Sequence, residues 1–283
     1  MAKFAADGVS RKNNTHGVSE VSKALSDVDV VSEEVTRVGY SVIKNVFSKK
    51  DCVLAKKKID KVYDKQIKEC GNEKFLFSIN DQDVARALFL YDDFFLKFIK
   101  NTTIQKSLRK FFGDKYILNL QNAPINRPHN SHYGSTWHRD LSYQHFVPSR
   151  PISITTLVCL DKFTKKNGGT CILPFSHKFE KFTSDKFVKK NERFISAEAG
   201  DVIFFDSLLF HRAGANRTGK DRKLIVQLFT LPFIKQQIDY SKMLNGRYSK
   251  NKNLSYILGY DSRVEDSVLN WRKRRKARFL KKT

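Results

Sequence analysis

Residues 199–214 read Ala-Gly-Asp-Val-Ile-Phe-Phe-Asp-Ser-Leu-Leu-Phe-His-Arg-Ala-Gly, and this stretch indicates the type of fold most clearly. Gly200-Asp201 is typical of a turn, Val202–Phe205 of a short buried strand, and Asp206-Ser207 of a second turn. His211 then stands at the end of the next apolar run. Short apolar runs that are separated by turns, with no helix between them, are typical of antiparallel β structure.

The same pattern extends outward over the middle of the chain, from Lys115 to Phe233. Further strands are expected near residues 116–120, 152–160, 170–173 and 223–231. We therefore predict an antiparallel sandwich or barrel. Helical spacing dominates the preceding segment, with helices expected from Ser48, over 81–100 and over 103–112. The expected fold class is mainly β with flanking helices.

The composition predicts a folded core and an anionic partner. The chain has 283 residues, of which 40% are hydrophobic, and its 53 Lys and Arg residues exceed its 29 Asp and Glu residues to give a formal charge of +24. Such a charge attracts phosphates, acidic lipids, anionic metabolites or nucleic acid. We expect a flexible segment over residues 1–30, a folded domain over 31–240 and a basic, helical tail over 241–283. This tail contains 13 basic residues and three acidic ones.

Several protein classes are excluded at this stage. No stretch approaches the roughly 20 apolar residues of a membrane-spanning helix, and the first residues lack the apolar core of a signal peptide. The four cysteines show no Cys-x-x-Cys spacing, which favours reduced thiols over a disulfide framework or a zinc site. We expect a cytoplasmic protein.

A candidate metal site begins with His138-Arg139-Asp140. On a strand, residues i and i+2 point to the same face, so His138 and Asp140 would converge while Arg139 turns away. A second histidine, for which His211 is the candidate, would complete the two-His-one-carboxylate triad of non-haem Fe(II) sites. The triplet alone is weak evidence, because a chain of this composition contains such a triplet by chance about as often as not.

Arg222 is the candidate anion receptor. It begins the strand 223–231, where alternation places Arg222 on one face with Leu224, Val226 and Leu228. A buried guanidinium needs an anionic partner and can bind a carboxylate through two parallel hydrogen bonds. Arg212 and Arg217 compete for this role, but both are expected in a loop.

These residues, taken in order, resemble the phytanoyl-CoA dioxygenase family of Fe(II)- and 2-oxoglutarate-dependent oxygenases. The matching pieces are Trp137-His-Arg-Asp140, Lys166-Asn-Gly-Gly-Thr-Cys-Ile-Leu-Pro-Phe-Ser-His177, the stretch 199–206, His211, Asn216, Arg222 and the opening Gly39-Tyr-Ser-Val-Ile-Lys44. The resemblance covers about residues 32–233, and the ordered set is far more specific than any one motif.

The resemblance implies a double-stranded β-helix (jelly-roll or cupin-like) core within a dioxygenase domain over 31–240. His138, Asp140 and His211 would hold Fe(II), and Arg222 would bind the distal carboxylate of 2-oxoglutarate. Turnover would consume O2 and release succinate and CO2 while the substrate is hydroxylated. The carboxylate of Asp140 favours hydroxylation, because related halogenases lack it.

Two positions depart from the family pattern. Phe175 stands where the family usually has Gly, which puts the geometry of that turn in question. Ala213 stands where many members have Ser two residues after the distal His, so one hydrogen bond to the co-substrate is in question. Neither departure removes a metal ligand.

Further residues are expected around the pocket. Gln121 and Asn126 lie on or just after the strand upstream of the metal motif and are candidates for contact with substrate or 2-oxoglutarate, although turn formation explains the Asn equally well. Trp137, Tyr143 and His145 are candidates for the substrate pocket, as wall rather than as recognition elements.

The substrate and the basic tail leave alternatives open. The expected substrate is a small or carrier-, sugar- or lipid-linked metabolite, possibly anionic. The alternatives are the same chemistry on nucleic acid or protein, and a non-catalytic basic binding module. Residues 263–283 could form a helix on an anionic membrane, contact nucleic acid through phosphates, or pack through Trp271 with a solvated basic end.

Overall fold

The computed structural model describes residues 26–129, 133–141 and 146–280. Within these residues the strands form two sheets, a six-stranded sheet in the order β1-β7-β4-β9-β3-β2 and a three-stranded sheet in the order β6-β5-β8. The strands of the large sheet are β1 (Tyr40–Ile43), β2 (Val84–Ala85), β3 (Ile117–Asn126), β4 (Ser153–Cys159), β7 (Val202–Asp206) and β9 (Arg222–Thr230). The strands of the small sheet are β5 (Thr170–Ile172), β6 (Arg193–Phe194) and β8 (His211–Ala213).

All strand pairs are antiparallel, and the large sheet is buried on both faces. Alternation along β7 places Val202 and Phe204 in the core beneath the helices, whereas Ile203 and Phe205 pack toward the small sheet. Because both faces are apolar, the strand reads as a continuous hydrophobic run. The two facing sheets form the double-stranded β-helix, and the predicted strands near 116–120, 152–160, 170–173, 202–205 and 223–231 are confirmed.

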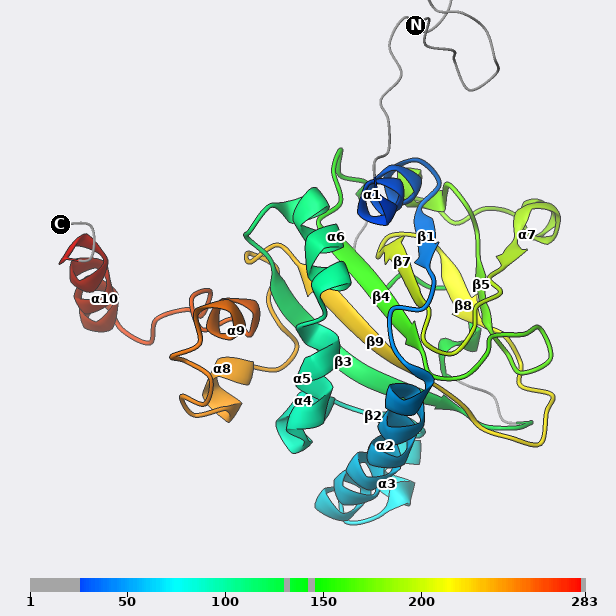
Figure 1. Ribbon diagram of the computed structural model, residues 1–283, viewed down its shortest axis with the longest axis horizontal. Coiled ribbons are helices and arrows are strands. Elements are labelled where there is room, and N and C mark those ends of the chain that lie inside the picture. The colour runs from blue at the N-terminus through cyan, green and yellow to red at the C-terminus, as the bar shows by residue number, and fades with distance from the viewer. Residues whose placement is uncertain (1–25, 130–132, 142–145, 281–283) are drawn as a thin grey trace, which may run out of the picture.

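Helices cover the outer face of the large sheet, as Figure 1 shows. They are α1 (Asp27–Arg37), α2 (Lys49–Glu69), α3 (Glu73–Ser78), α4 (Leu88–Tyr91), η2 (Asp93–Phe95), α5 (Leu96–Ile99) and α6 (Thr102–Phe112), while η3 (Tyr133–Ser135), η4 (Ser176–Lys178) and α7 (Asp185–Asn191) lie in connections between strands. The Ser48 hydroxyl caps α2 by accepting a hydrogen bond from the Asp51 amide at 3.1 Å, as the sequence predicts.

The prediction of one continuous helix over residues 81–100 is wrong. Instead this segment contains β2, α4, η2 and α5, separated by short breaks. Ala87 has φ 47° in the left-handed region, and Asp92 is extended and caps η2 by accepting from the Phe94 amide at 2.9 Å. These two backbone conformations interrupt the helical run, although its apolar residues, such as Phe89 and Phe98, are buried as a helix pattern implies.

The expected boundaries at both ends need correction. Helix α1 begins at Asp27, inside the segment expected to be flexible, because Val31 and Val35 pack into the core; residues 1–25 lie outside the described residues. After residue 240, α8 (Tyr240–Met243) and α9 (Lys252–Ile257) also pack on the body through Tyr240, Leu254 and Leu258. The last helix of the expected tail, α10 (Val268–Leu280), lies apart from the sheets and the helices that cover them (Figure 1).

The structure agrees with two further expectations from the sequence. The four cysteines are free thiols. Among the described residues, no helix has both the length and the apolar character needed to cross a membrane.

Candidate metal and co-substrate site

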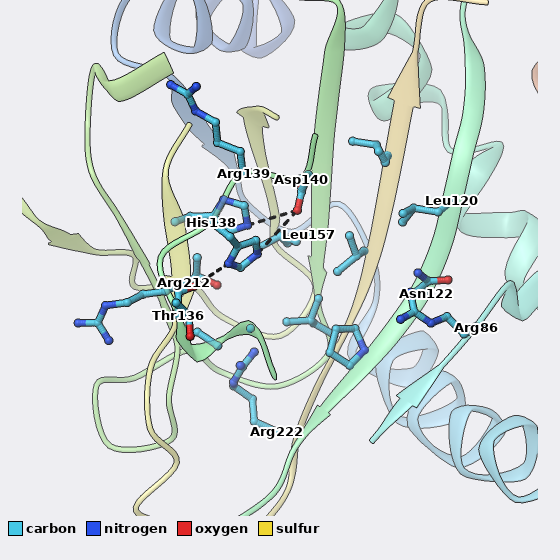
Figure 2. Close-up of a pocket in the computed structure, with 18 of the residues that line it drawn as sticks. Arg86, Leu120, Asn122, Thr136, His138, Arg139, Asp140, Leu157, Arg212 and Arg222 are labelled. Carbon is cyan, nitrogen blue, oxygen red and sulfur yellow. Dashed lines mark hydrogen bonds and ion pairs between the residues drawn. The ribbon is translucent and has the colours of Figure 1, made fainter. Parts of the chain in front are cut away.

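His138, Asp140 and His211 come together between the two sheets. Nε2 of His211 lies 3.5 Å from Oδ1 of Asp140, and Nε2 of His138 lies 4.0 Å from the same oxygen. One ligand atom from each residue lies within 4.8 Å of the other two (Figure 2). Two imidazoles and one carboxylate in such a cluster match the donor set of the facial triad that binds non-haem Fe(II).

Main-chain hydrogen bonds hold the three ligands in place. The amide of His138 donates to the carbonyl of His211 and the amide of His211 donates to the carbonyl of His138, both at 3.0 Å. The Asp140 amide donates to the carbonyl of Ser207 at 3.0 Å. The segment around His138 is therefore an isolated bridge rather than the predicted strand, but the two side chains converge as expected. Arg139 turns away from the cluster (Figure 2), and its guanidinium donates to the carbonyl of Ser176 at 3.1 Å.

Both histidines are oriented through their Nδ1 atoms. Nδ1 of His138 lies 2.7 Å from the carbonyl oxygen of Thr136, and Nδ1 of His211 lies 3.0 Å from that of Leu209. A carbonyl only accepts, so Nδ1 of each ring carries the proton. When the rings are neutral, this tautomer leaves the Nε2 lone pair of each free to bind a metal ion. Burial lowers the pKa of His138 and favours its neutral form, whereas the nearby Asp140 carboxylate raises the pKa of His211.

A row of three hydroxyl groups, connected by hydrogen bonds, leads to the carboxylate of Asp140. Thr155 donates to Oδ2 of Asp140, the Thr155 hydroxyl lies 2.9 Å from that of Ser207, and Ser207 lies 2.7 Å from the Ser153 hydroxyl. Burial alone would raise the pKa of Asp140, but His211, His138 and Thr155 lower it below its usual range. The carboxylate is thus held ionised, as a metal ligand must be. No sequence pattern indicates this row of hydroxyl groups, because β4 is buried along its whole length.

Arg222 lies at one end of the same cavity, and its side chain points toward the two histidines (Figure 2). Its Nε donates to the carbonyl of Asn167 at 3.2 Å, and its guanidinium lies 4.6 Å from the ring centre of Phe163. Nη1 is buried and has no hydrogen-bond partner among the described residues. Burial lowers the pKa of Arg222 to about 10, and the residue is only 2% exposed.

The buried guanidinium therefore needs a partner that the described residues do not supply. Asp161, a carboxylate that acts on the pKa of Arg222, is already bound by the ammonium group of Lys56 and by the Lys223 amide. An unpaired buried charge is costly, and a carboxylate from a bound molecule would satisfy it. The distal carboxylate of 2-oxoglutarate fits this requirement.

The cavity around these residues measures about 390 Å³. Its apolar wall comes from the large sheet and consists of Leu120, Leu157, Leu224, Val226 and Leu228. The predicted face of β9, with Arg222 and alternating apolar residues, is confirmed. Arg86, Asn122 and Gln237 add polar groups, with Arg86 and Asn122 on the far side from the histidines (Figure 2). These three residues were not predicted, because their segments carry no motif.

Gln121 and Asn126 do not line this cavity. The Gln121 side chain lies on the opposite face of β3, where Nε2 donates to the carbonyl of Phe95 at 3.0 Å and Oε1 accepts from the Phe89 amide at 3.2 Å. Asn126 donates to the carbonyls of Gly168 and Gly214 at 3.3 and 3.0 Å and so ties two loops to β3. The alternation of β3 instead turns Leu120, Asn122 and Pro124 inward.

Trp137 also points away from the cavity, because it alternates with His138. Its ring packs 6.0 Å from that of Phe182 and 5.1 Å from the guanidinium of Arg212, which pairs with Glu192 at 2.9 Å. Trp137 therefore supports the metal-binding segment from outside. The other two predicted pocket residues, Tyr143 and His145, lie outside the described residues.

The two departures from the family pattern have different outcomes. Phe175 adopts φ 66°, a left-handed conformation that favours Gly. The turn therefore has the backbone conformation that suits the Gly usual in the family, and the Phe175 side chain is 55% exposed. Ala213 lines the cavity, and its methyl group offers no hydrogen bond there.

Comparison with known structures agrees with this fold. HygX of Streptomyces hygroscopicus superposes with a TM-score of 0.58 over 77% of this chain and 92% of that one, at 14% identity. The non-heme alpha ketoglutarate dependent epimerase SnoN from nogalamycin biosynthesis gives 0.54 over 72% and 81%, at 16% identity. An uncharacterized protein of Mycobacterium tuberculosis is 27% identical over 84% of this chain and 89% of its own.

The fold, the His-Asp-His cluster and the match to a dioxygenase family model together define the protein as a dioxygenase. The chain belongs to the phytanoyl-CoA dioxygenase (PhyH) family, whose model matches residues 35–224. The human peroxisomal phytanoyl-CoA dioxygenase is 25% identical over 66% of this chain and 63% of its own length.

Proposed function

We propose that this protein is an Fe(II)- and 2-oxoglutarate-dependent hydroxylase in which His138, Asp140 and His211 hold the iron and Arg222 binds 2-oxoglutarate. The observation that carries the proposal is the pairing of a complete donor set with a buried, unsatisfied guanidinium in one cavity. Fe(II) with 2-oxoglutarate supplies oxidation of a C–H bond by O2, with release of succinate and CO2.

The residues of the chain position the reactants for this chemistry. The carbonyls of Thr136 and Leu209 fix which nitrogen of each histidine faces the cavity. Thr155 and the serines behind it hold the Asp140 carboxylate at one orientation. Arg222 orients the co-substrate from the other end of the cavity, where Phe163 excludes water from its guanidinium. The carboxylate of Asp140 occupies the position that halogenases leave open, which favours hydroxylation.

The substrate that fits this cavity is a small molecule with an apolar part and a polar or anionic group. Leu120, Val226 and Leu228 offer an apolar wall. Arg86, whose guanidinium is oriented by Asp81 at 3.1 Å, contributes a cation on the far side from the histidines. A carrier-linked acid combines both features, and the name of the human and bovine relatives, phytanoyl-CoA dioxygenase, is in keeping with this class.

A turnover assay tests the proposal. Purified protein with Fe(II), 2-oxoglutarate and O2 is incubated with a metabolite panel that includes acyl-carrier conjugates, and succinate release is measured with a mass search for products heavier by one oxygen. A metabolite that accelerates succinate release and gains one oxygen supports the proposal, provided that Asp140→Ala abolishes both signals. Acceleration by oligonucleotides or proteins alone would contradict the small-molecule substrate.

A further inference from the structure

Helix α10 stands apart from the sheets (Figure 1), and Arg274 ties it to the loop that precedes it. Figure 1 shows it beyond α9, connected by the segment 258–267. The contact runs through Arg274, which donates to Glu265 at 2.6 Å and to the carbonyl of Tyr260 at 3.1 Å. This ion pair anchors the helix to its own connecting loop rather than to the sheets.

Several other cations of α10 face solvent. The helix contains six basic residues and no acidic one. Arg272, Lys273 and Lys276 are exposed, and no carboxylate among the described residues pairs with them. Cations crowded on one helix repel each other, so an anionic partner outside the chain would stabilise this arrangement.

Apolar side chains are exposed on the same helix and on the loop before it. The exposed fractions are 92% for Val264, 67% for Val268, 60% for Leu269, 51% for Trp271 and 62% for Phe279. Val268, Trp271 and Phe279 follow the spacing i, i+3 and i+11, which places them on one side of the helix. Arg275 lies between the two rings, 5.3 Å from the centre of Trp271 and 5.5 Å from that of Phe279.

We propose that α10 binds the surface of an anionic lipid membrane. Trp271, Phe279 and Val268 would enter the boundary between headgroups and acyl chains, and the flanking Arg and Lys side chains would contact lipid phosphates. The helix lies on the membrane and does not cross it, because 13 residues are too few to span the hydrocarbon core. The catalytic domain is thereby held at a lipid surface, whatever its substrate.

The apolar residues distinguish a membrane from nucleic acid as the partner. Phosphate contacts of nucleic acid would use the cations, and Trp271 could stack on a base. Neither contact uses Val264, Val268 or Leu269, which are aliphatic and more than half exposed. A lipid surface accounts for both the aliphatic residues and the charge.

Vesicle binding of the full chain tests this proposal. The chain has two tryptophans, so a Trp137→Phe variant leaves Trp271 as the sole tryptophan, whose emission is followed by selective excitation of tryptophan. Its emission should shift to shorter wavelength with vesicles of phosphatidylcholine containing about one third phosphatidylglycerol, and should not shift with phosphatidylcholine alone. In sedimentation, Trp271→Ala with Phe279→Ala should weaken binding about tenfold or more. Arg272→Glu, Lys273→Glu and Lys276→Glu together should abolish it.

Matched controls lie on α2 and α3, away from α10 (Figure 1). Phe75 and Phe77 on α3 are 49% and 53% exposed, so Phe75→Ala with Phe77→Ala removes comparable aromatic surface and should leave vesicle binding unchanged. Lys57→Glu, Lys61→Glu and Lys68→Glu on α2 are the corresponding charge control. Equal losses in controls and α10 variants would overturn the proposal. So would an absence of binding to anionic vesicles, or binding to a short oligonucleotide that depends on the α10 cations but not on Trp271 and Phe279.

Discussion

His138 and His211 exchange two main-chain hydrogen bonds, each 3.0 Å long, although one residue lies in an irregular segment and the other begins strand β8. The pair fixes the spacing of the two imidazoles at the level of the backbone, and their ring centres lie 4.3 Å apart. The backbone pairing thus presets the relative position of the two histidines in the proposed metal site. Such preorganisation lowers the entropic cost of binding.

Arg222 should set the affinity for 2-oxoglutarate. Arg222→Leu is expected to raise the KM for 2-oxoglutarate by about 10- to 100-fold, because a charge-assisted bidentate contact is lost. Steady-state kinetics with varied 2-oxoglutarate measure this effect. Arg212→Leu is the matched control, since Arg212 also lines the cavity but is paired with Glu192. A larger KM change in the control would contradict the assignment.

The same substitution should not destabilise the ligand-free protein. Nη1 of Arg222 is buried without a partner among the described residues, so replacing the guanidinium by an apolar group removes a desolvation cost. We expect the Tm of Arg222→Leu to equal or exceed that of the wild type in the absence of 2-oxoglutarate. Added 2-oxoglutarate with Fe(II) should raise the Tm of the wild type more than that of Arg222→Leu at the same ligand concentration, and a clear drop in the Tm of the variant without ligand would contradict this account.

Thr155 should raise the affinity for Fe(II) indirectly, because its hydroxyl binds Asp140 and not the metal ion. Thr155→Val removes the hydroxyl that donates to Asp140 and breaks the link to Ser207. We expect Fe(II) affinity to fall about 10- to 100-fold, because groups that orient a metal ligand typically contribute this much. Thr156→Val is the control, since its hydroxyl faces Gln227 on the other side of the sheet. Equal effects on Fe(II) affinity at the two positions would count against the proposed role.

The fold was more predictable from the sequence than the walls of the site. Short apolar runs separated by turns located the main strands, because buried β structure leaves a local signal in hydrophobicity. The triad and Arg222 were predictable because their spacing matches a known motif. Gln121 was misassigned because β3 is buried on both faces, so its sequence does not show which face meets the cavity. Arg86 and Gln237 approach from segments that only the tertiary fold brings together.

Phe175 should tolerate Gly better than a β-branched residue. At φ 66° a bulky side chain costs about 1–2 kcal/mol. Phe175→Gly relieves that cost in the folded state, but it also increases the conformational entropy of the unfolded state. Because the two effects oppose each other, the free energy of unfolding should change by less than about 1 kcal/mol. Phe175→Val should be less stable than Phe175→Gly by about 1–3 kcal/mol. Denaturant unfolding measures both, and equal stabilities would show that the turn does not require this conformation.

Two buried groups should have opposite effects on the pH dependence of stability. Burial raises the pKa of Asp206 to about 6 from an ordinary 3.8, so the folded state binds the proton first and this group stabilises the protein as pH falls from about 6 to 4. Burial lowers the pKa of His177 to about 4 from 6.5, so the unfolded state binds that proton first and stability is lost as pH falls through the same range. Each effect amounts to at most about 3 kcal/mol.

Single substitutions should separate these two contributions. Asp206→Asn keeps an acceptor for the Leu208 amide and should lose stability more steeply than the wild type on acidification from pH 6.5 to 4. His177→Gln should lose stability less steeply than the wild type over the same pH range. Denaturant unfolding at a series of pH values gives the comparison, and variant profiles that run parallel to the wild type would refute the assignment.

The most direct test of the central claim is an anaerobic titration with Fe(II) and 2-oxoglutarate, followed by visible absorption. Bound together at His138, Asp140, His211 and Arg222, the two should give a metal-to-ligand charge-transfer band. His138→Ala should abolish the band, and Arg222→Leu should shift its appearance to higher 2-oxoglutarate concentration. A wild-type protein without the band, or a band that survives His138→Ala, would contradict the proposed site.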